Sequence, residues 1–274
     1  MSVRTAVVTV ASRARAAHVY RQRAFVSALD RPDLLRAEAW LDPEPPPADP
    51  PALHVPPGEH GLRVGEGRNA AADAAIAAGA ELLIFLDADC LPGPELVDRY
   101  VQAAAALPGS ILCGPVTYLA EGVAPAGLAD LDALTRPHAA RPNPAPGAIV
   151  IADPADYNLF WSLSFAVDAA TWRASGGFSP AYQGYGAEDT DFAWRARAAG
   201  IPLAWVGGAH AYHQWHPTSA PPWQHLDDIL RNGATFAARW GEWPMGGWLE
   251  QFAAAGAIEW DGATWRRVPD PPAS

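Results

Sequence analysis

The chain has 274 residues, half of them hydrophobic, and a formal net charge of −11. This negative charge disfavours nucleic acid as a partner, since its phosphates would be repelled, and no apolar run approaches the roughly 18 residues of a membrane-spanning helix. The two cysteines, Cys90 and Cys113, are too few for a disulfide framework. Because Arg13 and Arg15 interrupt the apolar N-terminal segment, we read it as a first strand and expect a cytoplasmic protein.

The first half of the chain predicts strands that alternate with helices, which is typical of a parallel α/β sheet with right-handed crossovers. The Pro-rich stretch 43–51 between two of these elements is predicted to be a surface loop. Apolar and β-branched runs predict strands at 5–10, 34–41, 53–55, 82–86 and 111–118. Helical spacing and alanine runs predict helices at 15–29, 70–78 and 95–107.

The second half of the chain starts with an irregular segment. Residues 121–146 are rich in alanine and proline and have no clear period, so this segment is either a lid or a passive surface loop. Further on, the pattern predicts a strand at 158–167, a short helix at 168–175, a helix from about 191 to 199, a strand at 202–206 and a helix at 223–240.

The strand at 82–86 ends in two carboxylates, Asp87 and Asp89. Five large apolar residues in a row predict a strand buried on both faces, and the prolines that follow cannot extend it. In an open α/β sheet, ligands bind at the carboxyl ends of the strands, and carboxylate oxygens suit Mg²⁺ or Mn²⁺, which in turn can hold a diphosphate. The alternative is a capped strand end with a polar turn.

An acidic helix start forms a second candidate site. In the stretch GYGAEDTD, Glu188, Asp189 and Asp191 follow two glycines. The helix dipole favours acids in a first turn and explains one or two of them, but it does not explain the glycines, which allow backbone and ligand to approach closely. A carboxylate at this place could act as a general base for a hydroxyl nucleophile.

Two further features could bind a metal or an anion. His210, His213 and His216 follow directly on the strand at 202–206, and a neutral imidazole beside carboxylates suits Mn²⁺. Arg68 and Asn69 lie at the start of an Ala-rich helix, where backbone N–H groups and an arginine make an anion or nucleobase site. Packed histidines and an ordinary capped helix are the alternatives.

Taken in this order, the motifs resemble those of a family 2-type glycosyltransferase of the GT-A fold, an α/β fold with a mostly parallel central sheet flanked by helices. The second half of the chain resembles the C-terminal region shared by β-1,4-galactosyltransferases and polypeptide N-acetylgalactosaminyltransferases. Two departures from the family pattern are Ala187, where many relatives have glycine, and the opening loop around Ser12. The matching pieces are Gly67-Arg68-Asn69, FLDADCLPGPELV, Gly176-Gly177-Phe178 and GYGAEDTDFAWRARAAG, with His213 placed 25 residues after Glu188.

The resemblance implies a metal bound by Asp89, His213 and also Asp87, with His210 and His216 as substitutes for His213. It implies Asp189 as the general base and Glu188 as a residue that positions a substrate. Nucleotide-sugar contacts are then expected from Ser12, Asp42, Arg68, Asn69 and Asp87, and acceptor contacts from Trp161, Asp191 and Trp215, whose rings or carboxylate could meet a sugar.

On this basis we expect an inverting, metal-dependent glycosyltransferase with Mn²⁺ or Mg²⁺ as cofactor. It would move a sugar from a nucleotide-diphosphate donor, a UDP-sugar, to a hydroxyl of a saccharide or other acceptor. Its GT-A domain is expected over 1–220, with a nucleotide-binding half at 1–118 and a catalytic half at 150–220, followed by a helical Trp-rich extension at 221–274. The alternatives are a sugar nucleotidylyltransferase and a non-catalytic carbohydrate- or nucleotide-binding module on the same fold.

Overall fold

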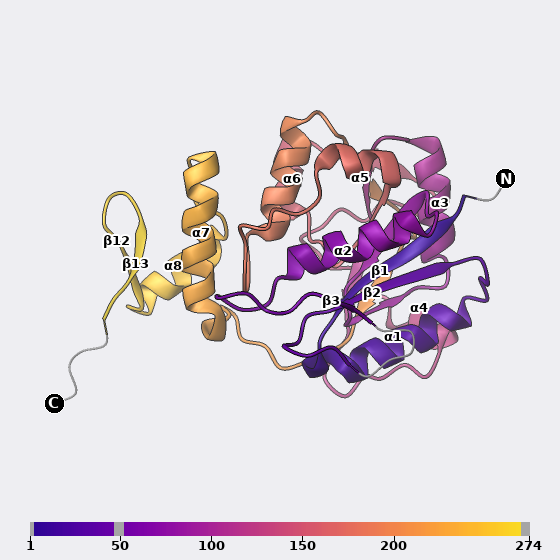
Figure 1. Cartoon of the computed structure of the whole chain (residues 1–274), viewed down its shortest axis with the longest axis horizontal. Helices are drawn as coiled ribbons and strands as arrows, with labels where there is room; N and C mark the ends of the chain where they lie inside the picture. Colours follow the sequence, from indigo (N-terminus) through magenta and orange to yellow (C-terminus); the bar gives the residue numbers. More distant parts are fainter. Residues whose placement is uncertain (1–2, 47–51, 270–274) are drawn as a thin grey trace.

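A computed structural model describes residues 3–46 and 52–269. Its centre is a sheet with the strand order β3-β2-β1-β4-β9-β6-β10-β8; Figure 1 labels β1, β2 and β3. The strands are β1 (Thr5–Ala11), β2 (Leu35–Trp40), β3 (Leu53–His54), β4 (Leu82–Leu86), β6 (Ile111–Cys113), β8 (Ile149–Ile151), β9 (Ser164–Asp168) and β10 (Leu203–Val206). Strands β1 to β4 run parallel, whereas β9 lies antiparallel between β4 and β6. The expected α/β class with a mostly parallel sheet is confirmed.

Helices cover both faces of this sheet (Figure 1). On one face, α2 (Val64–Ala77), α5 (Ala169–Ser175) and α6 (Glu188–Ala198) bury apolar side chains against it. On the other face, α1 (Ala16–Ala28) and α3 (Leu96–Ala106) do the same. Because β4 is buried on both faces, it reads as a continuous apolar run in the sequence. Strand β1 is buried as well, and its run of apolar residues is interrupted by Thr9.

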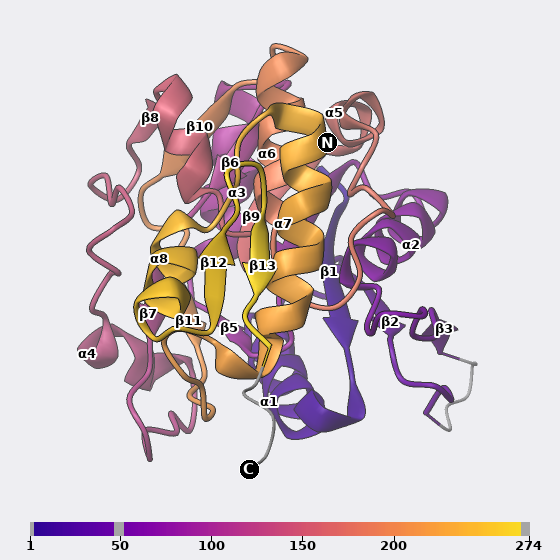
Figure 2. The ribbon, with the colours of Figure 1, turned by 90° about the vertical axis from the view of Figure 1, so that its left-hand side faces the viewer.

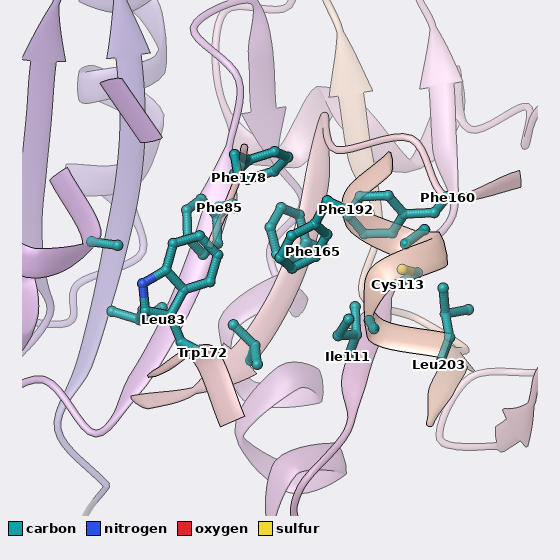
Figure 3. Close-up of a cluster of buried hydrophobic side chains, with 14 of the residues drawn as sticks. Leu83, Phe85, Ile111, Cys113, Phe160, Phe165, Trp172, Phe178, Phe192 and Leu203 are labelled. Carbon is teal, nitrogen blue, oxygen red and sulfur yellow. The ribbon is translucent and has the colours of Figure 1, made fainter. Parts of the chain in front are cut away.

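Aromatic rings fill the core beneath α5 and α6 (Figure 3). The rings of Phe85 and Phe165, on neighbouring strands, are stacked at 4.3 Å, and those of Phe178 and Phe192 at 4.6 Å. Trp172 tilts against Phe85 at 4.7 Å. This packing fixes α6 against the carboxyl end of β4, where the candidate site begins.

A small second sheet crosses the carboxyl ends of the central strands. It consists of β5 (Cys90–Pro92), β11 (Ala211–His213) and β7 (Val116–Tyr118), in that order from β5. In its antiparallel pairing, His213 lies opposite Cys90, the residue after Asp89. The register of this sheet therefore brings the first acidic motif and the histidine segment together.

The C-terminal region contains more than helices (Figure 2). Helices α7 (Leu226–Trp240) and α8 (Gly246–Ala254) are followed by a hairpin of β12 (Ile258–Trp260) and β13 (Trp265–Arg267), which the sequence pattern did not indicate. These elements share a small core, while Phe236 of α7 packs against Trp194 of the main core. The extension therefore packs directly against α6.

Several sequence expectations need correction. The strand expected at 111–118 is two strands in different sheets, because the chain turns at Gly114-Pro115. The strand expected at 158–167 is a 3₁₀ helix, Pro154–Leu159, followed by β9. The helix expected to start at Ala70 starts at Val64, so Arg68 and Asn69 lie within it.

The segment 121–146 is largely irregular and contains the short helix α4 (Leu131–Leu134). Most of the Pro-rich stretch 43–51, namely 47–51, lies outside the described residues. Within the ranges that the structure describes, no helix is both long enough and apolar enough to cross a membrane.

Candidate active site

A cleft of about 780 Å³ opens at the carboxyl end of β4, between the central sheet, the start of α6 and the start of α8. Charged and imidazole groups gather on one part of its wall and aromatic side chains on another. The first group comprises Arg15, Arg68, Asp87, Asp89, Glu188, Asp189, His213 and His216. The second comprises Tyr118, Trp161, Tyr185, Trp215 and Trp248.

Asp89, His213 and His216 form a three-residue cluster whose potential ligand atoms all lie within 4.8 Å of one another. The two Asp89 oxygens lie 3.5 Å from His213 Nε2 and 3.4 Å from His216 Nε2. A backbone hydrogen bond of 2.6 Å from Gln214 N–H to the Asp89 carbonyl holds the two segments together. One carboxylate and two imidazoles are a donor set that fits a divalent transition metal.

The charge state of this cluster follows from its contacts. The hydrogen bond to Asp89 raises the pKa of His216, whereas burial lowers the pKa of His213. Burial disfavours the Asp89 carboxylate, but the two histidines and Arg15 outweigh this effect and lower its pKa. Asp89 is therefore ionised over the neutral pH range, as a metal ligand must be.

His210 is separate from this cluster. Its ring is buried, and Nε2 lies 2.7 Å from the Thr117 hydroxyl. Burial lowers the His210 pKa to about 4, so the ring stays neutral. Of the three histidines, His213 and His216 face Asp89 and His210 faces the interior.

Asp87 pairs with an arginine instead of joining the cluster. Its Oδ1 accepts a 2.8 Å hydrogen bond from Arg68, whose side chain is almost fully buried. Arg68 also lies 3.6 Å from Glu188 Oε1, so it links the first acidic motif to the second. Burial raises the pKa of Asp87 although Arg68 opposes this shift.

Glu188 and Asp189 lie in the first turn of α6 and line the cleft. Burial and the neighbouring Asp189 charge raise the Glu188 pKa to about 7, and burial raises that of Asp189 as well. Asp189 Oδ1 accepts a 2.7 Å hydrogen bond from the Thr190 N–H. Ala187, the departure from the glycine of many relatives, has a left-handed φ of 72°. Alanine is strained in this conformation, whereas glycine is not.

Helix α7 holds the loop that precedes these acids. The Asn232 amide donates to the carbonyls of Gln183, Tyr185 and Gly186 at 2.9, 3.1 and 3.1 Å. Asp228 accepts from the Tyr185 N–H at 3.2 Å. The C-terminal region therefore fixes the approach to Glu188, a contribution that no local sequence signal indicated.

Two predicted site residues have structural roles instead. The Asn69 amide exchanges two 2.8 Å hydrogen bonds with the backbone of Phe178, which leaves it turned away from the cleft. Asp191 is fully buried and ion-paired with Arg195 and Arg239 at 2.9 and 2.8 Å. We therefore correct both assignments: Asn69 is not placed to contact a nucleotide, and Asp191 is not placed to contact an acceptor.

Ser12 and Asp42 lie at the carboxyl ends of β1 and β2, outside the lining of the cleft. The Asp42 carboxylate accepts two hydrogen bonds from the Arg13 N–H, at 3.1 and 2.9 Å, and thereby ties the two strand ends together. The sequence reasoning missed Arg15 of the same loop, which lines the cleft 3.5 Å from Asp89.

The aromatic part of the cleft wall includes residues that no sequence motif indicated. Tyr118 stacks on His213 with ring centroids 4.6 Å apart. Trp161, an expected acceptor residue, lines the cleft, and the Arg141 guanidinium lies 5.2 Å from its ring and from that of Trp205. Trp215 also lines the cleft and is 40% exposed.

Comparison with known proteins finds a family match over part of the chain and a similar fold in solved structures. Residues 151–217, from β8 to just beyond the histidine cluster, match the family described as "N-terminal domain of galactosyltransferase". This segment contains Glu188, Asp189, His213 and His216. No curated protein shows significant sequence similarity to the chain.

Two structures of S. aureus TarS share the fold. S. aureus TarS is 10% identical with a TM-score of 0.56, and the match covers 85% of this chain and 40% of TarS. A structure of TarS residues 1–349 is 11% identical with a TM-score of 0.55, covering 85% of this chain and 65% of the other. A Drosophila β1,4-galactosyltransferase 7 mutant, in complex with manganese, UDP-Gal and xylobiose, is 16% identical with a TM-score of 0.46, over 75% and 66% of the two chains. The chain thus spans less than two thirds of the length of either TarS structure.

Proposed function

We propose that this protein is a metal-dependent, inverting glycosyltransferase that transfers a sugar from a UDP-sugar to a hydroxyl group of a saccharide. The observation that carries the proposal is the meeting of two groups in one cleft: the cluster of Asp89, His213 and His216, and the acidic pair Glu188 and Asp189. The match of 151–217 to a galactosyltransferase family supports the same reaction class.

The cluster would hold the cation through one carboxylate oxygen and two imidazole nitrogens. This mixed donor set suits Mn²⁺ better than Mg²⁺, which prefers oxygen ligands. A divalent ion in this place would neutralise negative charge on the departing diphosphate. In this proposal the cation allows an acidic protein to bind an anionic donor.

The donor nucleotide is assigned to the side of the cleft next to β1 and β4. Arg68 is a buried cation that contacts Asp87 and faces the cleft, and Arg15 lies on the other side of Asp89. In our proposal Asp87 binds the ribose, while Ser12 and Asp42 contact the nucleoside at the ends of β1 and β2. The two arginines supply positive charge near a diphosphate.

Asp189 is the proposed general base. It lies at the start of α6 in the cleft, and its raised pKa brings it closer to the pH at which proton transfer is efficient. Glu188, which lies 3.6 Å from Arg68, would position the sugar hydroxyls. A single displacement requires one base and no protein nucleophile, which is the basis for proposing inversion.

Calorimetry with UDP tests the proposal, with and without Mn²⁺. The wild-type protein should bind UDP much more tightly with Mn²⁺, and Asp89→Ala should lose this dependence while keeping its melting temperature. Asp73→Ala, on the exposed face of α2, is the matched control. Equal UDP affinity in Asp89→Ala and wild type would reject the metal site.

A screen of nucleotide sugars, read as released nucleotide in the presence of Mn²⁺, tests catalysis without knowledge of the acceptor. Release of UDP from a UDP-sugar, reduced in Asp189→Asn, is expected. A protein that binds UDP and Mn²⁺ but releases no nucleotide from any donor would instead be a binding module.

A further inference from the structure

The C-terminal region lines one end of the cleft. Met245 and Trp248, at the start of α8, line the cleft together with Tyr185 from the loop before α6. Glu188 and Asp189 line the same cleft. Met245 and Trp248 lie beyond the segment 151–217 that matches the galactosyltransferase family, so the family match does not account for this end of the cleft.

The rings at this end are arranged side by side. Tyr185 stacks on His225 with centroids 4.3 Å apart and an interplanar angle of 10°, and Trp248 lies 5.9 Å from Tyr185 at a 31° tilt. Tyr185 keeps 38% of its surface exposed. Burial and the charges of Asp189 and Glu188 raise the Tyr185 pKa to about 12, so a neutral phenol faces the acidic pair.

This arrangement is fixed before any ligand arrives. The backbone of Tyr185 is held by Asn232 and Asp228 of α7. Met245 has a left-handed φ of 59° and packs so closely on Gly186 that a Cβ at Gly186 would lie 2.9 Å from its sulfur. A surface that is already ordered loses little conformational entropy when it binds.

The side chains at the aromatic end of the cleft indicate which kind of ligand it can bind. Aromatic rings pack against the apolar C–H face of a pyranose, and nearby carboxylates accept hydrogen bonds from its hydroxyl groups. Four carboxylates line the cleft, those of Asp87, Asp89, Glu188 and Asp189, so an anionic ring next to the acidic pair would be repelled.

We propose that Tyr185, Met245 and Trp248 form a subsite for a neutral pyranose ring of the acceptor. In this subsite the ring packs on Trp248 and Tyr185 and turns a hydroxyl group toward Asp189. The subsite deepens the proposed function and rests on it, because it names the class of acceptor. It also gives the C-terminal region a role in acceptor choice.

The test is saturation-transfer NMR with a panel of neutral methyl β-glycosides in the presence of UDP and Mg²⁺, a diamagnetic ion. At least one glycoside should receive saturation from wild-type protein. In Trp248→Ala its Kd should rise about tenfold, the upper range for loss of one aromatic stacking partner. Trp260→Ala, which removes an exposed tryptophan of the hairpin, should leave the Kd unchanged.

Two further measurements keep the test decisive. Trp248→Leu keeps an apolar side chain but no ring, should raise the Kd as Trp248→Ala does, and replaces that variant if it does not fold. A methyl glucuronide, which is anionic, should bind more weakly than its neutral counterpart. Absence of glycoside binding in wild type, or equal binding in wild type and both Trp248 variants, would overturn the subsite.

UDP affinity separates the two proposals. If UDP and Mn²⁺ bind together but no neutral glycoside does, the subsite fails and the proposed function stands. If wild-type protein shows no metal-dependent UDP binding, the proposed function itself fails. Glycoside binding without UDP binding would indicate a carbohydrate-binding module, and would overturn the assignment of this ring as an acceptor.

Discussion

At the metal end of the cleft, Asp89 and His213 lie beside neighbouring strands whose hydrogen-bond register sets their separation. At the aromatic end, Tyr185 and Trp248 meet because α7 packs on Trp194 of α6 and holds the loop before α6, while α8 shares a small core with α7. The hydrogen-bond register of the strands fixes the geometry of the metal end. Side-chain contacts between distant segments fix the geometry of the aromatic end. Substitutions at the metal end should therefore act on metal and donor, and those at the aromatic end on the acceptor or the loop.

The largest effect is expected where the two ends meet, at Asp189. Asp189→Asn is nearly isosteric, and loss of the base should lower kcat by about 10²–10⁴-fold, or roughly 3–5 kcal/mol. Transfer rate at saturating donor is the measurement, with UDP affinity and Tm as controls. A rate within threefold of wild type would remove Asp189 as the base and make Glu188 the next candidate.

Asp191→Asn, two residues after Asp189, should affect folding and not catalysis. Because Asp191 is buried between Arg195 and Arg239, its loss should act on folding, by about 3–5 kcal/mol as for a broken buried ion pair. Denaturant unfolding should show this loss. A stable Asp191→Asn protein with impaired acceptor binding would contradict the structural role.

The next largest effects concern the metal end. His213→Ala and His216→Ala should each weaken Mn²⁺-dependent UDP binding by at least about tenfold, since both rings face Asp89. His210→Ala should lower Tm without changing this dependence, because its ring faces Thr117. Calorimetry of the three variants checks this. If only His213→Ala weakens Mn²⁺-dependent UDP binding, His216 is not a metal ligand.

At the aromatic end, Asn232→Asp keeps the shape of the side chain but replaces its N–H donors by carboxylate oxygen, next to three carbonyls. The loop before Glu188 should loosen, with Tm reduced and kcat lowered about tenfold, the equivalent of one lost buried hydrogen-bond partner. UDP affinity should not change. Thr235→Ala, on the same helix, is the control, and a changed UDP affinity with normal kcat would oppose this positioning role.

We expect the folding stability of the metal-free protein to depend on pH through the ionisation of Glu188. Burial and Asp189 raise its pKa from 4.5 to about 7, with Arg68 opposing and Asp87 adding to the shift. A raised folded-state pKa means that stability is fully present below 4.5 and is lost as the pH rises through about 7. Glu188→Gln should therefore show a smaller fall in Tm over this range. Parallel Tm–pH curves for the two proteins would contradict it.

The smallest effect is expected at Arg141. Arg141→Met removes the cation between Trp161 and Trp205, so Trp161 should hold its place in the cleft wall less firmly. We expect an acceptor KM about threefold higher, the scale of one cation–π contact, with kcat at saturation unchanged. Arg173→Met, at an exposed site, is the control. A fall in kcat without a change in KM would contradict this role.

Local sequence pattern was sufficient to predict the strand 82–86 and its terminal Asp87 and Asp89, because a strand buried on both faces shows as an unbroken apolar run. It also determined the acidic start of α6, because glycines and acids at a helix start are local features. These patterns predicted the α/β class, and the family resemblance placed Asp89 and Asp189 as candidates in one site.

Contacts between side chains that are distant in the sequence could not be predicted from local pattern. The three histidines have equal spacing, but strand pairing turns His213 toward Asp89 and His210 toward Thr117, and the chain beyond β11 returns His216 to Asp89. Asn232 and Trp248 reach the loop and the cleft from helices far along the chain. Local sequence patterns record burial and chain direction, whereas such contacts depend on long-range packing and hydrogen-bond register.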